Sequence, residues 1–166
     1  MIHLTDKTLT DPISVVGLQI RTSNARELGG EGLIASIWSR FFAENLAAQI
    51  PNRSSDSFFA VYSNYASDEN GYYDFLLGCP VESIAVIPEG MTYAAIATGD
   101  YAVFTTETGP VAEVVQATWK HIWKRTPEEL GHKRAFLSDY EVYDHRAADP
   151  ANAKVEIHIG LEADPA

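Results

Sequence analysis

The chain contains the same order of secondary-structure signals twice, and this duplication limits the folds that it can adopt. In the first half, a β-branched run at 13–20 predicts a strand, and the apolar spacing at 33–45 predicts an amphipathic helix. Two aromatic-rich extended runs follow at 58–65 and 73–81. The first half therefore predicts a βαββ unit over about residues 12–82.

The second half repeats this order over about residues 91–161. An extended run at 91–106 comes before a helical pattern that begins near Gly109. Two further strands are expected at 136–143 and 154–161. The second half therefore predicts another βαββ unit.

Matched residues support the duplication. The predicted helices carry Trp38 and Trp119 at equivalent positions, and the aromatic strand segments align so that Ser63 matches Glu141. Two βαββ repeats related by a pseudo-two-fold axis would leave a cleft between them, and small-molecule sites usually lie at such concave junctions. We therefore expect one α+β domain over residues 1–166, in which the duplicated repeats form an antiparallel sheet with two helices and a central ligand cleft.

The alignment makes one difference between the halves informative. Where the first half has Ser63, the second half has Glu141 within an apolar strand. Because side chains alternate along a strand, Glu141 and Tyr143 share one face, and the repeat places Ser63 and Tyr65 on the corresponding face of the first half. If that face lines the cleft, Glu141 is an anion among aromatic rings, which suits large organic cations. A glutamate on the solvent face of an edge strand is the alternative that the pattern leaves open.

Burial of an unpaired carboxylate is costly, so in the cleft Glu141 should either bind a cation or have a raised pKa. Trp38 and Trp119 would supply stacking surface beside it, although aromatic residues on the inward face of a helix also pack into ordinary cores. The candidate ligand-binding residues are Glu141, Tyr143, Trp38, Tyr65, Trp119 and Ser63.

The charge balance limits the partners of such a site. The chain has 12 Lys and Arg residues against 23 Asp and Glu residues, and its formal net charge is -11. This charge repels phosphate backbones and attracts cations, so we expect a small organic cation or aromatic ligand and no direct contact with nucleic acid. No apolar run approaches the roughly 20 residues that cross a bilayer, and the lone Cys79 suits a reducing compartment. We therefore expect no membrane contact and a cytoplasmic location.

The sequence contains no recognised cofactor or metal motif. The histidines include no HxxxH pair, which argues against a metal site. Gly29, Gly30 and Gly32 lie between a strand and a helix but match neither the P-loop nor the GxGxxG fingerprint. We therefore expect no cofactor and no metal, and interpret the glycines as a flexible loop.

Five short segments follow one another in an order that is more specific than any one of them. They are Val15-Val-Gly-Leu18, Ile37-Trp38, Gly99-Asp-Tyr-Ala-Val-Phe104, Ser138-Asp-Tyr-Glu-Val-Tyr143 and Val155-Glu-Ile-His-Ile159. In these segments the chain resembles the gyrase-inhibitor-like effector-binding domains, which also occur at the C-terminus of multidrug-responsive transcription activators of the MerR and AraC types. The resemblance covers nearly the whole chain.

The resemblance implies a central cleft between two βαββ repeats and a buried glutamate that contacts cationic ligands. By motif this glutamate is Glu141, and Trp38 and Tyr65 match aromatic positions of the family's pocket. The chain shows no helix-turn-helix or basic DNA-binding signal, so it resembles a stand-alone form of the domain.

Three functions are open at this point. The first, which we prefer, is a ligand-binding or sensing module in which Glu141 supplies charge and the aromatic residues supply stacking surface. The second is a hydrolase of small electrophilic molecules, as in some stand-alone relatives, with Glu141 as general acid or base. The third is a regulatory protein that acts through a protein partner. Formation of a homodimer is also left open.

Overall fold

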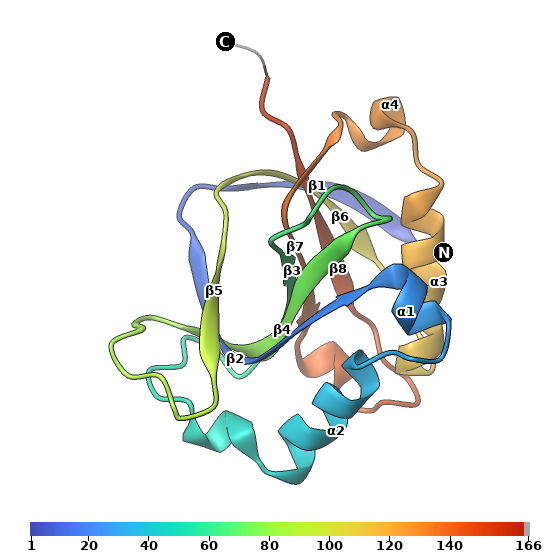
Figure 1. Cartoon of the computed structure of the whole chain (residues 1–166). Coiled ribbons are helices and arrows are strands. Elements are labelled where there is room, and N and C mark those ends of the chain that lie inside the picture. The colour runs from blue at the N-terminus through green and yellow to red at the C-terminus, as the bar shows by residue number, and fades with distance from the viewer. Residues whose placement is uncertain (165–166) are drawn as a thin grey trace.

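The computed structural model describes residues 1–164, so the last two residues of the predicted domain lie outside the described part of the chain. Eight strands form one antiparallel sheet in the order β1-β6-β8-β7-β3-β4-β2-β5 (Figure 1). The strands are β1 (His3–Leu9), β2 (Ile13–Ser23), β3 (Phe58–Ser63), β4 (Tyr72–Val81), β5 (Thr92–Ile96), β6 (Gly99–Thr105), β7 (Arg134–Tyr143) and β8 (Glu156–Leu161). The helices are α1 (Asn24–Leu28), α2 (Ile34–Ala43), α3 (Val111–Trp123) and α4 (Pro127–Leu130).

The order of the strands has the symmetry of a duplicated unit. β3 and β7 pair in the centre, β4 and β8 flank them, β2 and β6 come next, and β5 and β1 form the two edges. α2 connects β2 to β3, and α3 connects β6 to β7, so each half contains one strand–helix–strand–strand unit. Both helices cover the same side of the sheet (Figure 1). The prediction of an α+β fold built from duplicated βαββ repeats is confirmed.

The two edge strands exchange places between the halves. β5 comes just before β6 in the chain but pairs with β2, while β1 comes just before β2 but pairs with β6. The run at 91–106 therefore forms two strands where the sequence predicts one extended run. The second of them begins at Gly99, whose φ of 139° is unfavourable for residues with a Cβ. The sequence does not predict β1, because nearly all of its side chains are exposed and no apolar face marks it.

The first predicted helix is shorter than its apolar pattern. α2 ends at Ala43, and Asn45 then takes a left-handed backbone conformation with a φ of 50°, which interrupts the helix. The apolar residues that follow form a short 3-10 turn at Leu46–Gln49. Before α2, the short helix α1 starts after Ser23, whose hydroxyl accepts a hydrogen bond from the backbone N–H of Arg26.

Two glycines allow β2 and β4 to approach closely. Gly17 and Gly78 lie directly opposite each other in the ladder. A Cβ at Gly17 would overlap the carbonyl oxygen of Leu77, and a Cβ at Gly78 would overlap that of Val16. This contact between the two backbones requires glycine on both strands.

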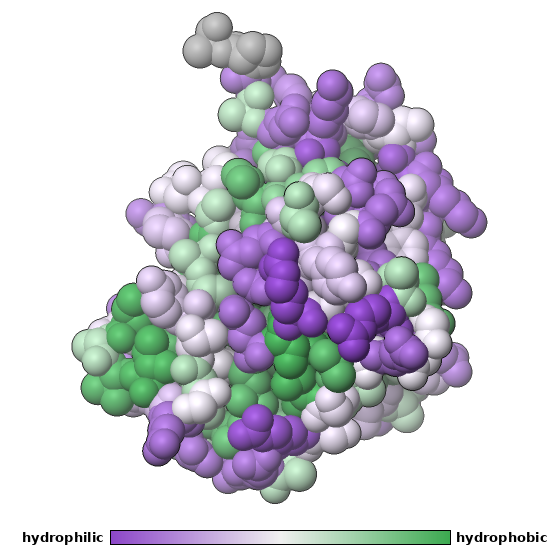
Figure 2. All heavy atoms as spheres, viewed as in Figure 1, coloured by the Kyte–Doolittle hydropathy of each residue, from purple (hydrophilic) through white to green (hydrophobic). Residues whose placement is uncertain are grey.

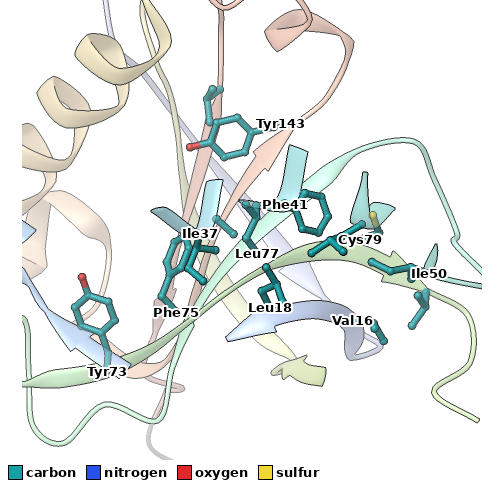
Figure 3. Packing of buried hydrophobic residues seen from close by; sticks show 14 residues of the cluster. Val16, Leu18, Ile37, Phe41, Ile50, Tyr73, Phe75, Leu77, Cys79 and Tyr143 are labelled. Atoms are coloured by element: carbon teal, nitrogen blue, oxygen red, sulfur yellow. The ribbon is translucent and has the colours of Figure 1, made fainter. Parts of the chain in front are cut away.

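The main hydrophobic core lies between the covered face of the sheet and α2. Figure 3 shows Leu18 of β2, Phe75 and Leu77 of β4 and Phe41 of α2 in this cluster, together with Tyr143 of β7. A second cluster lies on the opposite face and contains Val15, Val61, Leu76, Ala94, Ile96, Tyr101 and Tyr140. The sheet is therefore buried on both faces, which explains why its central strands are apolar over most of their length.

Hydrophilic side chains cover much of the surface in Figure 2, and hydrophobic areas lie near the centre and at the left, where the loop after β4 runs. In that loop, Ile84 and Val86 are exposed. No helix in residues 1–164 is both long enough and apolar enough to cross a membrane.

Candidate functional site

A cavity of about 1180 Å³ lies between the sheet and the helices that cover it. Residues of β3, β4 and β7 line it on the sheet side, and residues of α1, α2 and α3 line it on the helix side. Both halves of the chain contribute, as expected for a cleft between two repeats. Pockets for drug-sized ligands usually measure about 300–1,000 Å³, so this cavity has room for a large aromatic molecule.

Glu141 of β7 lines this cavity and is 1% exposed. Both oxygens of its carboxylate accept hydrogen bonds from neutral groups. Oε2 accepts from the Tyr62 hydroxyl at 2.9 Å and from the Trp119 indole N–H at 2.6 Å. Oε1 accepts from the Tyr143 hydroxyl at 2.6 Å. Within residues 1–164, no basic group lies within ion-pair distance of the carboxylate.

These surroundings change the pKa of the carboxyl group and of its tyrosine partners. Burial raises the pKa of Glu141, because the charged form loses its hydration, while the three hydrogen bonds to the carboxylate act in the opposite direction. Burial also raises the pKa of Tyr62 and of Tyr143 well above the ordinary value, and the charge of Glu141 adds to this effect. Both hydroxyls therefore stay protonated and act as donors to the carboxylate.

Aromatic rings from both halves surround the carboxylate. Trp38 of α2 meets Tyr143 edge to face, with ring centroids 4.7 Å apart. From the other half, Trp119 of α3 meets Tyr62 at 5.1 Å, and Tyr73 lies beyond Tyr62 at 5.3 Å. The negative faces of such rings attract organic cations, so the walls and the carboxylate favour the same kind of ligand.

A second carboxylate lies two residues away on the same face of β7. Asp139 is fully buried, and its Oδ2 accepts from Nη2 of Arg134 at 2.8 Å and from the Tyr65 hydroxyl. Its Oδ1 accepts from the backbone N–H of Gly160 at 2.8 Å. Arg134 itself forms part of the cavity wall. Asp139 therefore has a basic partner, which Glu141 lacks among the described residues.

The structure brings most of the candidate residues together at the cavity. Five of them line it: Trp38, Tyr65, Trp119, Glu141 and Tyr143. Their side chains come from both repeats, and they enclose one carboxylate. The sixth candidate does not lie there.

Ser63 lies on the other face of the sheet, contrary to the alignment of the two halves. It is opposite Ser138 in the β3–β7 ladder, whereas Glu141 is opposite Ala60. The side chain of β3 that reaches Glu141 is that of Tyr62. The expected alignment is thus one residue out of register, and a shift of one residue reverses the face of every side chain in a strand.

Sequence patterns also miss the pair formed by Arg134 and Asp139. An odd spacing along a regular strand puts two side chains on opposite faces. The pairing of β7 with β8 shifts register between these two residues, and Phe136 has a positive φ of 52°. This irregularity allows Arg134 to reach Asp139, and alternation alone gives no sign of it.

Glu27 of α1 lines the cavity and forms hydrogen bonds to the start of α2. Its carboxylate accepts from the Thr22 hydroxyl at 2.6 Å and from the backbone N–H groups of Leu33 and Ile34 at 2.9 and 3.1 Å. N–H groups at the start of a helix lack partners within the helix, so Glu27 caps α2. The cap fixes the helix that carries Trp38.

The site offers a buried carboxylate and aromatic surface. In residues 1–164, no three His, Cys, Asp or Glu side chains are grouped so that they could hold a metal ion. Cys79 of β4 lies in the main hydrophobic core, and burial raises the pKa of its thiol to about 11. A thiolate nucleophile is therefore disfavoured.

Comparison with protein families gives a match over nearly the whole chain. Residues 8–161 match the family described as Cass2, integron-associated effector binding protein. This range includes both βαββ units and every residue that contacts the Glu141 carboxylate.

Individual proteins are similar over the same range. "Putative transcriptional regulator protein YobU" of Bacillus subtilis (strain 168) is 36% identical over 147 residues, which are 88% of this chain and 90% of that protein. The crystal structure of the integron cassette protein VCH_CASS2, from the mobile metagenome of Vibrio cholerae, is 27% identical, with a TM-score of 0.71 over 97% of this chain and 95% of that chain. The structure of SAV2435 bound to tetraphenylphosphonium has a TM-score of 0.74 over 98% of this chain and 94% of that chain. At 17% identity, the last similarity shows the fold alone.

Proposed function

The chain belongs to the Cass2 family of integron-associated effector-binding proteins, and from this premise we propose that its effector is a small aromatic or amphipathic cation bound beside Glu141. One observation carries the proposal. The carboxylate of Glu141 is 1% exposed and has three neutral donors, but no basic partner within residues 1–164. A buried charge is stabilised above all by an opposite charge, and the ligand would supply it.

The three neutral donors orient the Glu141 carboxylate and stabilise its charge, but they do not balance that charge. The hydroxyls of Tyr62 and Tyr143 and the indole N–H of Trp119 stabilise the charged form of Glu141, so its pKa rises less than burial alone would raise it. None of these three donors carries a charge that would balance the carboxylate. Because the surroundings are apolar, the charge of the carboxylate acts on a bound cation with less screening than at the surface.

The shape of the cavity favours a ligand with aromatic rings. Trp38 and Tyr143 form one wall, and Trp119 and Tyr62 form another, so a flat cation between them would contact rings from both repeats. The volume of about 1180 Å³ leaves room for ligands of several sizes. This combination supports a broad class of cationic aromatic ligands rather than one small metabolite.

One structural neighbour is bound to a ligand of this class. SAV2435, which has the same fold, is bound to tetraphenylphosphonium, a permanent cation with four aromatic rings. Its sequence is too distant for its ligand to be transferred to this chain. The proposal for this chain therefore rests on Glu141 and on the aromatic walls, and the relative suggests the first compound to test.

We propose that the chain acts as a sensing module. The match with "Putative transcriptional regulator protein YobU" covers 90% of that protein, so a regulatory role is the function to consider first. A sensing module would pass on the presence of its ligand through a protein partner or a second copy of the chain. Size-exclusion chromatography with and without ligand tests for the second copy.

Titration calorimetry with tetraphenylphosphonium tests the proposed ligand class. Glu141→Gln keeps the size of the side chain and removes its charge, so we expect the Kd to rise at least about tenfold. Glu113→Gln is the matched control, since it removes the same charge from an exposed position of α3 outside the cavity. Equal weakening by both variants would mean that only the net charge matters, and it would overturn the proposal.

The same variants separate binding from catalysis by Glu141. A raised pKa is also a property of a general acid or base, and a hydrolase would use it on an electrophilic ligand. If Glu141→Gln binds its ligand with unchanged affinity but no longer converts it, the enzyme hypothesis replaces the binding hypothesis. Chromatography of the ligand after incubation with the protein detects conversion.

A further inference from the structure

We propose that the cavity has a second recognition point at Arg134, which binds a carboxylate of the ligand, so that the preferred effectors are aromatic cations that also carry a carboxylate. This inference rests on the proposed function, because it places the cationic part of the ligand beside Glu141. It adds an anionic group to the ligand and a position for that group in the cavity.

Arg134 has hydrogen-bond donors that the described chain does not use. A guanidinium carries five N–H donors. Within residues 1–164, its hydrogen bond is the one from Nη2 to Asp139 at 2.8 Å, and its Nε is buried without a partner. The side chain is 11% exposed and forms part of the cavity wall. A planar guanidinium in this position matches the two oxygens of a carboxylate.

The guanidinium is held in place before any ligand arrives. Its Cζ lies 4.3 Å from the centroid of the Phe136 ring, and its Nη2 is fixed by Asp139. Asp139 is fixed in turn by the Tyr65 hydroxyl and the backbone N–H of Gly160. A donor that is already oriented loses less conformational entropy when a ligand binds.

The spacing of the two recognition points fits a single ligand. Asp139 and Glu141 are two residues apart on one strand, which corresponds to about 7 Å. Three tyrosines form a connected row from one carboxylate to the other. Tyr65 contacts Asp139, Tyr73 lies next to Tyr65 at 5.9 Å and to Tyr62 at 5.3 Å, and Tyr62 contacts Glu141. A ring system of that length would lie along the row, with one charged group at each end.

The charges at the two ends give the ligand one orientation. At one end, Glu141 is an anion with only neutral donors around it. At the other end, the charge of Asp139 is balanced by Arg134, and both of its oxygens accept hydrogen bonds. A ligand carboxylate at this end meets N–H donors, whereas beside Glu141 it would meet a like charge.

A rhodamine dye and its methyl ester provide the test. The free acid is a zwitterion at neutral pH, and the ester has the same aromatic cation without the carboxylate. We would measure the Kd of both dyes by fluorescence polarisation with the full chain and with Arg134→Gln/Asp139→Asn, which removes both partners of the ion pair. We expect the acid to bind about tenfold more weakly to the variant, and the ester to change less than about twofold.

Two further variants keep the test decisive. Arg134→Lys retains the charge next to Asp139 but loses the planar fork, so the acid should lose affinity relative to the ester here too, by about threefold or more. If the double variant fails to fold, Arg134→Lys alone tests whether Arg134 binds the carboxylate of the ligand. Arg40→Gln removes an exposed arginine of α2 and should change neither Kd. The inference would be overturned if the ratio of the two Kd values, acid to ester, in the Arg134 variants stayed within about twofold of the ratio in the natural chain.

Failure of this inference differs from failure of the proposed function. If Glu141→Gln weakens binding of the ester but the Arg134 variants leave the ratio unchanged, the cation site stands and the carboxylate site does not. If Glu141→Gln leaves binding of the ester unchanged, the proposed function fails, and this inference fails with it.

Discussion

Asp139 and Glu141 lie two residues apart on the same face of β7, and of these two carboxylates only Asp139 has a basic partner within residues 1–164. The two carboxylates lie on one strand, and both are buried. Arg134 balances the charge of the first, and only neutral donors surround the second. We therefore propose that the first carboxylate supports the structure and that the second binds a cation from outside the chain.

The affinity for a permanent cation should depend on pH through Glu141. Burial raises the pKa of Glu141 above its ordinary value of 4.5, and only its charged form attracts the ligand. As the pH falls below that raised pKa, the Kd for tetraphenylphosphonium should rise about tenfold per pH unit, and above it the Kd should be constant. The charge of this ligand does not change with pH. Titrations between about pH 4 and pH 8 would measure the curve, and a flat curve would contradict the role of Glu141.

Removal of one donor should move this pH curve. The Tyr143 hydroxyl donates to Glu141 at 2.6 Å and stabilises its charged form. In Tyr143→Phe the pKa of Glu141 should rise further, and the midpoint of the binding curve should shift upward by about one pH unit. Tyr140→Phe is the matched control, because its buried hydroxyl has no partner among the described residues and its ring packs on the opposite face. Equal shifts in both variants would exclude a specific effect of the hydrogen bond.

Glu141→Gln should stabilise the protein at neutral pH. Because the pKa of Glu141 is raised in the folded state, the folded protein holds this proton more tightly than the unfolded chain does. Stability is therefore lost as the pH rises from the ordinary value of 4.5 through the raised value, and it stays lower above that window. The glutamine avoids this loss, so the free energy of unfolding at pH 7 should increase. Urea unfolding measures it, and a marked decrease would mean that the carboxylate stabilises the fold.

The contact between Gly17 and Gly78 should be essential for the sheet. In Gly78→Ala the new Cβ would overlap the carbonyl oxygen of Val16, so β2 and β4 would have to separate. We expect a loss of at least about 3 kcal/mol in the free energy of unfolding. Gly30→Ala is a suitable comparison for thermal unfolding, because nothing lies within 4 Å of a Cβ there, although its φ of 86° adds some strain. If Gly78→Ala unfolds at the same temperature as the natural chain, the close contact between β2 and β4 does not require glycine at this position.

Features that depend on periodicity were predictable from the sequence. The apolar spacing around Trp119 predicts α3, because one face of that helix is apolar, and the run of aromatic and β-branched residues around Glu141 predicts β7. The repeat then indicates that the tryptophans of the two helices lie on equivalent sides of one cleft. That reasoning places Glu141 and Tyr143 on one face, as the structure has them.

Features that depend on register were not predictable. Ser63 and Tyr62 are neighbours in the chain, and aligning the halves by aromatic residues selected the one that lies on the wrong face. The Arg134–Asp139 pair requires an irregular strand with a positive φ at Phe136, which no alternation pattern indicates. β1 is exposed along its length and carries no apolar signal. In each case the missing information is a backbone pairing, which composition and spacing do not determine.

The most direct measurement compares a cation with a neutral molecule of nearly the same shape. Methyltriphenylphosphonium and triphenylphosphine oxide differ in a methyl group and an oxygen, and only the first is charged. The natural chain should bind the cation at least about tenfold more tightly, and Glu141→Gln should reduce this preference to nearly equal affinities, while Glu113→Gln should retain it. A preference that is the same in the natural chain and in Glu141→Gln would contradict the account.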